Sequence, residues 1–121
     1  MPETKAKNMK PIMEIITICG DPFEWESEIT YLTERMTCSG KYCVLTPVIP
    51  FIKHPPVGGM FTASDIGHLV DAQRMKINLS SAILVMDKNS VVDEVTQCDV
   101  DYAKMQGKKI MLYSQEIHNW R

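Results

Sequence analysis

Apolar and polar positions along the chain form blocks that predict four strands separated by helices. The apolar blocks are short and rich in β-branched or aliphatic residues, as is typical of buried strands. They cover residues 12–19, 41–49, 82–86 and 109–113. Pro47 indicates that the second strand either ends there or lies at an edge of the sheet, since proline cannot donate to a ladder.

Two stretches between these blocks repeat apolar residues every three or four positions, the period of an amphipathic helix. The first runs over residues 24–36, and its glutamates favour the positive amino end of a helix. The second runs over residues 62–79. It opens with Thr62 followed by Asp65, the spacing of a capping box.

A third helix follows the most apolar strand through an acidic loop. It is predicted to begin near Asp93 and to end before Gly107, a residue suited to a helix C-terminus. Spacings of four, three, four and three positions place one set of apolar residues on a single face, the predicted buried stripe. This stripe consists of Val91, Val95, Cys98, Tyr102 and Met105.

Strands that alternate with helices are typical of right-handed βαβ crossovers and a parallel sheet. We therefore predict an α/β fold: a three-layer, doubly wound (Rossmann-like or flavodoxin-like) parallel sheet of about four or five strands with flanking helices. Residues 1–11 are expected to form a flexible tail and residues 12–121 a single domain. The Pro/Gly-rich segment 50–60 is expected to be a functional lid or a disordered insertion. Residues 114–121 read as a polar tail with Ile117 and Trp120 as docking points.

Composition excludes several classes of function. The 121-residue chain has a formal net charge of −2, which gives no electrostatic reason to expect binding to a nucleic-acid polymer. No apolar run is long enough to span a membrane and the first residues are polar, so we expect a cytoplasmic protein without a membrane partner. The four cysteines lack the spacing of metal ligands and are expected to be reduced and structural. Neither a metal nor another cofactor is predicted.

Parallel topology would gather the loops after the first three strands at one edge of the sheet, where open α/β sheets bind ligands. In the first loop, Gly20 and Asp21 precede a helix. Two interpretations stay open, an anion site on free N–H groups or a tight turn capped by Asp21. Five carboxylates lie on or just past the third loop: Asp87, Asp93, Glu94, Asp99 and Asp101.

Asp99 is predicted to lie where the buried face of the third helix meets this cleft. A carboxylate in that place can attack an electrophilic sugar carbon or stabilise an oxocarbenium-like centre, while a second carboxyl group handles protons. The alternative interpretation is a solvated acid on the side of a helix.

The residue combination resembles the nucleoside 2-deoxyribosyltransferase-like superfamily, most of all its small members. The resemblance spans about residues 12–113, and the segments that carry it are residues 16–20, 74–86 and 99–110. It implies a doubly wound parallel sheet. It also implies cleavage or transfer of the N-glycosidic bond of a 2′-deoxynucleoside or its 5′-monophosphate, in a homo-oligomer whose neighbouring subunit completes the site.

The resemblance also implies roles for single residues. Family members carry a catalytic glutamate four residues before an alanine, and here Asp99 stands four residues before Ala103. Asp99 is thus the implied nucleophile, with Asp21, Asp87 or Glu94 as acid, base or hydroxyl ligand. The implied substrate-binding residues are Gly20, Asp21, Asn89, Ser90 and Asp93, of which Ser90 and Asp93 stand where the family has glycines.

Aspartate in place of glutamate withdraws the carboxylate by one methylene, and a small misplacement of a catalytic group can cost on the order of a hundredfold in rate. We predict an enzyme, either a nucleoside deoxyribosyltransferase or a nucleotide N-glycosidase. The alternative is a catalytically inactive nucleotide-binding or assembly protein on the same scaffold.

Overall fold

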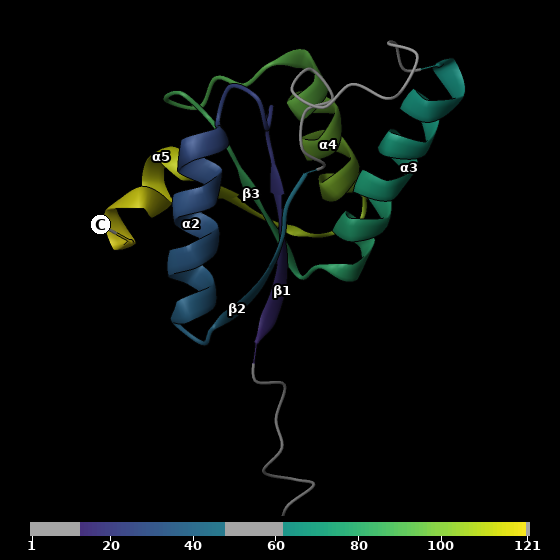
Figure 1. Ribbon diagram of the computed structural model, residues 1–121. Helices are drawn as coiled ribbons and strands as arrows, with labels where there is room; N and C mark the ends of the chain where they lie inside the picture. Colours follow the sequence, from purple (N-terminus) through teal and green to yellow (C-terminus); the bar gives the residue numbers. More distant parts are fainter. Residues whose placement is uncertain (1–12, 48–61, 121) are drawn as a thin grey trace, which may run out of the picture.

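The computed structural model describes residues 13–47 and 62–120 (Figure 1). In these ranges the chain forms a parallel four-stranded sheet with the order β2-β1-β3-β4. The strands are β1 (Glu14–Cys19), β2 (Tyr42–Leu45), β3 (Ala82–Val85) and β4 (Lys109–Leu112). The predicted doubly wound α/β fold is confirmed. The predicted tail and the predicted lid or insertion lie outside the described residues.

Helices cover both faces of the sheet. They are α2 (Glu26–Cys38), α3 (Ala63–Leu79), α4 (Glu94–Met105), α5 (Tyr113–Glu116) and the 3-10 helix η1 (Ile117–Asn119). Figure 1 shows α2 and α5 on one side of the sheet and α3 and α4 on the other. The chain therefore has three layers, and the central strands are apolar on both faces.

Each face of the sheet has its own apolar core. On the α2 side, Ile16 and Ile18 of β1 pack with residues of α2 such as Leu32. On the α3 and α4 side, Cys19 at the end of β1 packs with Val100 of α4. Because successive residues of β1 point to opposite faces, this strand anchors both cores and ends directly beneath the loops at the carboxyl edge.

The predicted helix boundaries agree with the structure at two caps. Thr62 and Asp65 form the expected capping box, in which the Asp65 N–H donates to Thr62 Oγ1 at 3.1 Å and the Thr62 N–H donates to Asp65 Oδ2 at 2.8 Å. Gly107 follows α4 with a φ of +72°, a conformation that favours glycine. The second strand is shorter than predicted, since β2 ends at Leu45.

The predicted buried stripe of α4 is wrong except at Tyr102, which is partly buried and packs against the core. Val95 and Met105 are 76% and 81% exposed, and Cys98 is also exposed. The helix instead buries Thr96, Val100 and Ala103. These side chains are small or of medium size, so the residues that face the sheet are not the largest apolar ones of the helix. This orientation turns Asp99 inward, because it lies three residues after Thr96 and four before Ala103.

The C-terminal segment is helical, whereas a polar tail was predicted. Ile117 is only 8% exposed and belongs to the core on the α2 side. The Trp120 ring lies 6.0 Å from the Tyr42 ring between centroids, and the Tyr31 hydroxyl donates to the Trp120 carbonyl at 2.7 Å. The prediction that Ile117 and Trp120 dock onto the domain is confirmed.

Candidate functional site

A pocket of about 260 Å³ opens at the carboxyl edge of the sheet. It brings together the turn after β1 and the first turns of α4, as the topology of open α/β sheets predicts. Ligand pockets are commonly about 300 Å³ or larger, so the described residues enclose only part of a nucleoside-sized ligand. The lining residues are Gly20, Asp21, Pro22, Asp93, Val95, Thr96 and Asp99.

Asp99 lies on the inward face of α4 and is partly buried. Burial raises the pKa of the Cys19 thiol, and the negative charge of Asp99 raises it further. The side-chain amide of Gln73 on α3 lies close enough to lower the pKa of the Asp99 carboxyl group. Asp99 is therefore enclosed between the end of β1, α3 and its own helix, with the pocket in front of it.

The acid strength of Asp99 differs from that of an ordinary aspartate. Burial raises the pKa of its carboxyl to about 6, and the charge of Asp93 raises it too, while the hydrogen bond from Gln73 and the positive charge of Arg74 lower it. The group is mostly ionised at pH 7 but is poorly solvated. A partly desolvated carboxylate with a perturbed pKa in a pocket is a candidate nucleophile or proton carrier.

Gln73 positions this carboxylate, a role that sequence reasoning missed. Its Nε2 donates to the Ile18 carbonyl at 3.3 Å and lies 3.6 Å from Cys19 Sγ. The same amide interacts with Asp99 and lowers the pKa of its carboxyl. The side chain thus ties α3 and α4 to the end of β1. The available signal was that Gln73, a polar residue, follows Leu69 and Val70 at the spacing of the apolar face in the predicted helix 62–79.

Replacing Gln73 with leucine is expected to raise the pKa of Asp99 above about 6. The variant removes the hydrogen bond that favours the ionised form, and one hydrogen bond corresponds to about one pKa unit. Titration of the Asp99 carboxyl carbon by NMR measures the change, with Gln106→Leu at the exposed end of α4 as control. An unchanged or lowered pKa in the Gln73 variant would contradict the assignment.

Asp21 and Asp93 each accept backbone hydrogen bonds, Asp21 in the turn before α2 and Asp93 at the start of α4. Asp21 Oδ1 accepts from the N–H of Phe23 at 2.8 Å and from that of Glu24 at 3.4 Å, in the turn that leads into α2. Asp93 Oδ1 accepts from the Thr96 N–H at 2.6 Å and caps α4. The structure shows a tight turn bonded by Asp21, but Asp21 does not cap α2, whose N-cap residue is Trp25 and has no side-chain cap.

Gly20 lets the ends of β1 and β3 approach each other under the pocket. A Cβ atom at this position would lie 2.6 Å from Met86 Cγ and 2.7 Å from Met86 Cβ. Met86 is itself buried, so it has little room to move. The glycine found by sequence reasoning therefore serves close packing.

Gly20→Ala is expected to lower the free energy of unfolding by about 1–3 kcal/mol, the usual cost of overpacking a core. Urea denaturation followed by circular dichroism measures it. Gly67→Ala is the matched control, because a Cβ there meets nothing within 4 Å and alanine is the better helix former. Equal stability of Gly20→Ala and the natural chain would show that the contact with Met86 relaxes freely.

Asp87 has a different environment from Asp99. It is 2% exposed, and its carboxylate accepts hydrogen bonds from the Ser90 N–H at 2.7 Å, the Ser114 N–H at 2.8 Å and the Ser114 hydroxyl at 2.6 Å. Burial alone would raise its pKa, but the hydrogen bonds from Ser114 and Ser90 together hold the pKa below the usual value. Asp87 does not line the pocket. It joins the loop after β3 to the start of α5.

Three other residues of the predicted site are not brought to the pocket. Asn89 and Ser90 form the turn after Lys88, with φ values of +51° and +74°, and Ser90 lines a separate groove beside β4. Asparagine tolerates such a conformation better than serine, so the backbone at Ser90 is strained. Glu94 is exposed in the first turn of α4 and does not line the pocket.

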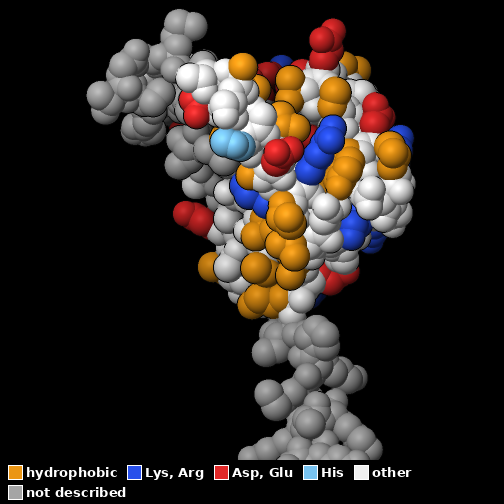
Figure 2. Space-filling view, turned by 90° about the vertical axis from the view of Figure 1, so that its right-hand side faces the viewer, with side chains coloured by type: hydrophobic (Ala, Val, Ile, Leu, Met, Phe, Trp, Pro, Cys, Tyr) orange, Lys and Arg blue, Asp and Glu red, His pale blue; other side chains and the backbone are white. Residues whose placement is uncertain are grey.

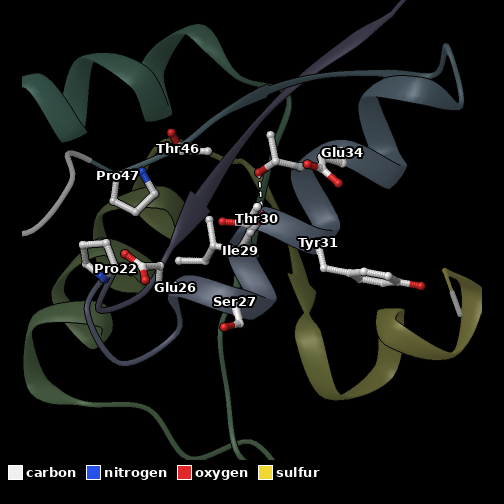
Figure 3. A pocket seen from close by; sticks show the side chains of 10 residues that line it. Pro22, Glu26, Ser27, Ile29, Thr30, Tyr31, Glu34, Thr46 and Pro47 are labelled. Atoms are coloured by element: carbon white, nitrogen blue, oxygen red, sulfur yellow. Dashed lines mark hydrogen bonds between the residues drawn. The ribbon is translucent and has the colours of Figure 1, made fainter.

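A larger cavity of about 670 Å³ lies beside α2 (Figure 3). In Figure 3, Pro22 and Pro47 stand at one end, while Tyr31 points away toward the C-terminal segment. Glu26 and Glu34, the carboxylates that line it, are exposed, and the rest of the lining is apolar or hydroxylic. Among the described residues that line this cavity no charged group is partly buried, so we assign the chemistry to the smaller pocket.

The described residues 13–47 and 62–120 contain neither a cluster of metal-binding side chains nor a membrane-spanning helix. Within these ranges no three histidine, cysteine or carboxylate side chains gather as they would around a metal ion. Nor is any helix there long and apolar enough to cross a membrane. All four cysteines are free thiols, of which Cys19 is buried and the others are exposed.

The chain was compared with known proteins. No family model matches it, and no curated protein matches it in sequence. A solved structure described as a 2-desoxiribosyltransferase from Leishmania mexicana is similar to it, with a TM-score of 0.54 and 20% identity over 82% of this chain. The chain spans 63% of that protein's length. At this identity the likeness shows the shared α/β fold.

Proposed function

We propose that this protein cleaves or transfers the N-glycosidic bond of a 2′-deoxynucleoside or its 5′-monophosphate. The observation that carries the proposal is the partly desolvated carboxylate of Asp99, with a pKa of about 6, facing a pocket at the carboxyl edge of the sheet. The fold shared with a structure described as a 2-desoxiribosyltransferase supports it.

In the proposed reaction the ionised Asp99 attacks C1′ of the sugar. The C1′–N bond breaks, its electron pair leaves with the base, and the base takes a proton from solvent at the pocket mouth. Water or a second base then attacks C1′ and loses a proton to solvent, the bond between C1′ and Asp99 breaks, and free sugar or a new nucleoside is released. The negative charge of Asp93 stabilises the positive charge that develops on the sugar in both steps.

The other predicted catalytic residues have different places in this proposal. Asp87 already accepts three hydrogen bonds from Ser90 and Ser114, so it supports the loop and takes no part in proton transfer. Glu94 lies outside the pocket lining and has no assigned step. Asp21 remains a candidate ligand for a sugar hydroxyl, because it lines the pocket.

The test is an assay for released base. The purified chain is incubated with a panel of 2′-deoxynucleosides and their 5′-monophosphates, with and without a free acceptor base, and the products are separated by chromatography. We expect release or exchange of at least one base. A folded protein that turns over none of them, yet binds one by titration calorimetry, would favour the second candidate, an inactive nucleotide-binding protein.

We also propose that a second copy of the chain packs on the α3 and α4 side. Apolar side chains remain uncovered there, including Val70 (46%), Leu79 (62%) and Val95 (76%). Figure 2 shows apolar groups on the α3 side of the molecule. A neighbouring subunit would also enlarge the small pocket. Light scattering is expected to show an oligomer that Val95→Glu weakens, and a monomeric natural chain would contradict this. We also propose a cytoplasmic location, where the four free cysteines would stay reduced.

A further inference from the structure

We propose that the pocket rejects phosphate and that the substrate is the neutral nucleoside, not its 5′-monophosphate. This inference rests on the proposed function and selects between the two substrate classes that it leaves open. It follows from what already occupies the anion-binding groups around the pocket. Two such groups, the turn after β1 and the first turn of α4, already donate hydrogen bonds to carboxylates of the chain itself.

The first such group is the turn between β1 and α2. Free backbone N–H groups at such a turn would be the natural place for a phosphate. Here Asp21 Oδ1 already accepts from the N–H groups of Phe23 and Glu24, at 2.8 and 3.4 Å. A phosphate would have to displace a carboxylate that is tied to its own backbone. The turn therefore presents a negative charge to the pocket and offers fewer donors.

The second group is the start of α4. Its positive end points toward the pocket, since Asp93, Val95 and Thr96 all contribute to the lining. Asp93 Oδ1 accepts from the Thr96 N–H at 2.6 Å, so this helix end is also neutralised from within the chain. The turn before α2 and the start of α4 thus each place a fixed carboxylate beside the pocket, from Asp21 and from Asp93.

The charges around the pocket are unbalanced. Asp21, Asp93 and Asp99 line it, and no lysine or arginine is found among the described lining residues. Two cations on neighbouring elements have other partners. Lys88 Nζ lies 3.0 Å from Glu24 Oε1, and the Arg74 guanidinium lies 5.0 Å from the centre of the Tyr102 ring. Arg74 also lowers the pKa of Asp99, so its charge is partly balanced by the nucleophile.

Sugar hydroxyls suit this arrangement better than phosphate oxygens do. A carboxylate accepts a hydrogen bond from a hydroxyl but repels a phosphate. Near a protein surface, repulsion between a phosphate and one fixed carboxylate weakens binding on the order of tenfold, and less at high salt. Two fixed carboxylates therefore give a marked preference for the neutral substrate.

The experiment compares kcat/KM of the full chain for one 2′-deoxynucleoside and for its 5′-monophosphate, at low and at high salt. We expect the nucleoside to be preferred at least about tenfold, with a smaller preference at high salt. In Asp21→Asn, asparagine can still cap the turn but carries no charge. The preference ratio is expected to fall by about tenfold in this variant.

Asp101→Asn is the matched control, because it removes the same charge from an exposed position of α4 outside the pocket lining. Its preference ratio should equal that of the natural chain. Equal or better use of the monophosphate would overturn the inference and leave the proposed function standing. A ratio that does not change in Asp21→Asn would also overturn it.

If the proposed function is wrong, the result is different, because neither compound is then turned over. Titration calorimetry with the same two compounds then decides the inference by itself. Tighter binding of the nucleoside, with the difference reduced in Asp21→Asn, would support it. Equal binding, tighter binding of the monophosphate, or no binding of either would overturn it.

Discussion

Replacing Asp99 with alanine is expected to lower the rate of base release at least about a thousandfold while the protein stays folded. The alanine removes the group that forms the bond to C1′, and Asp99 faces the pocket rather than the centre of the core. Chromatography of the released base measures the effect, and circular dichroism checks the fold. His68→Ala, on an exposed position of α3, is the control and should react at the natural rate.

The pH dependence of the natural chain belongs to the same prediction. Asp99 must be ionised to attack, so kcat/KM should fall as the pH drops through about 6. Because the folded-state pKa is raised, ionisation of Asp99 lowers the stability of the fold as the pH rises through that value. Asp99→Asn should therefore be the more stable protein at pH 7, by about 1 kcal/mol after allowance for partial exposure. An acid limb near pH 4 would contradict the raised pKa.

Replacing Asp87 with alanine is expected to lower the free energy of unfolding by about 2–4 kcal/mol. The change leaves the N–H groups of Ser90 and Ser114 and the Ser114 hydroxyl without their acceptor in a buried place. Urea denaturation at pH 7 measures the loss, with Asp101→Ala on the surface as control. A loss no larger than that of the control would contradict the supporting role of Asp87.

Acid should remove this contribution of Asp87. Its folded-state pKa lies below the usual value, so the stabilisation is present above that usual value and disappears as the pH falls through the lowered one. The difference in stability between the natural chain and Asp87→Ala should therefore shrink in strong acid. A difference that stays constant down to the acid transition would show that packing and not charge accounts for the effect.

The order of strands and helices was predictable because the apolar periods change sharply along the chain. A short continuous apolar run such as residues 82–86, too short for a typical helix, favours a strand that is covered on both faces. Helix caps such as Thr62 and Gly107 depend on residues that are close together in the chain, so they can be predicted from the sequence. The short helix after β4 depends instead on the packing of Ile117 and Trp120 into the core on the α2 side. This is a contact between segments that are distant in the sequence.

The candidate site was predictable only in part. The topology places Asp21, Asp93 and Asp99 at one edge, and they do line one pocket. The rotation of α4 was not predictable from hydrophobicity, because small residues and not the largest apolar ones face the sheet. Asp87 was assigned to the site from its place after a strand. Its hydrogen-bond partner Ser114 lies 27 positions away in the sequence, and no local sequence pattern predicts a bond over that separation.

The most direct test of the central claim is the mass of the intact protein after brief reaction with a 2′-deoxynucleoside and an acid quench. If Asp99 is the nucleophile, a fraction of the protein should be heavier by one deoxyribosyl group, and peptide analysis should place that group on Asp99. Asp99→Ala should show no such adduct. An adduct on another residue, or base release by Asp99→Ala at the natural rate, would contradict the account.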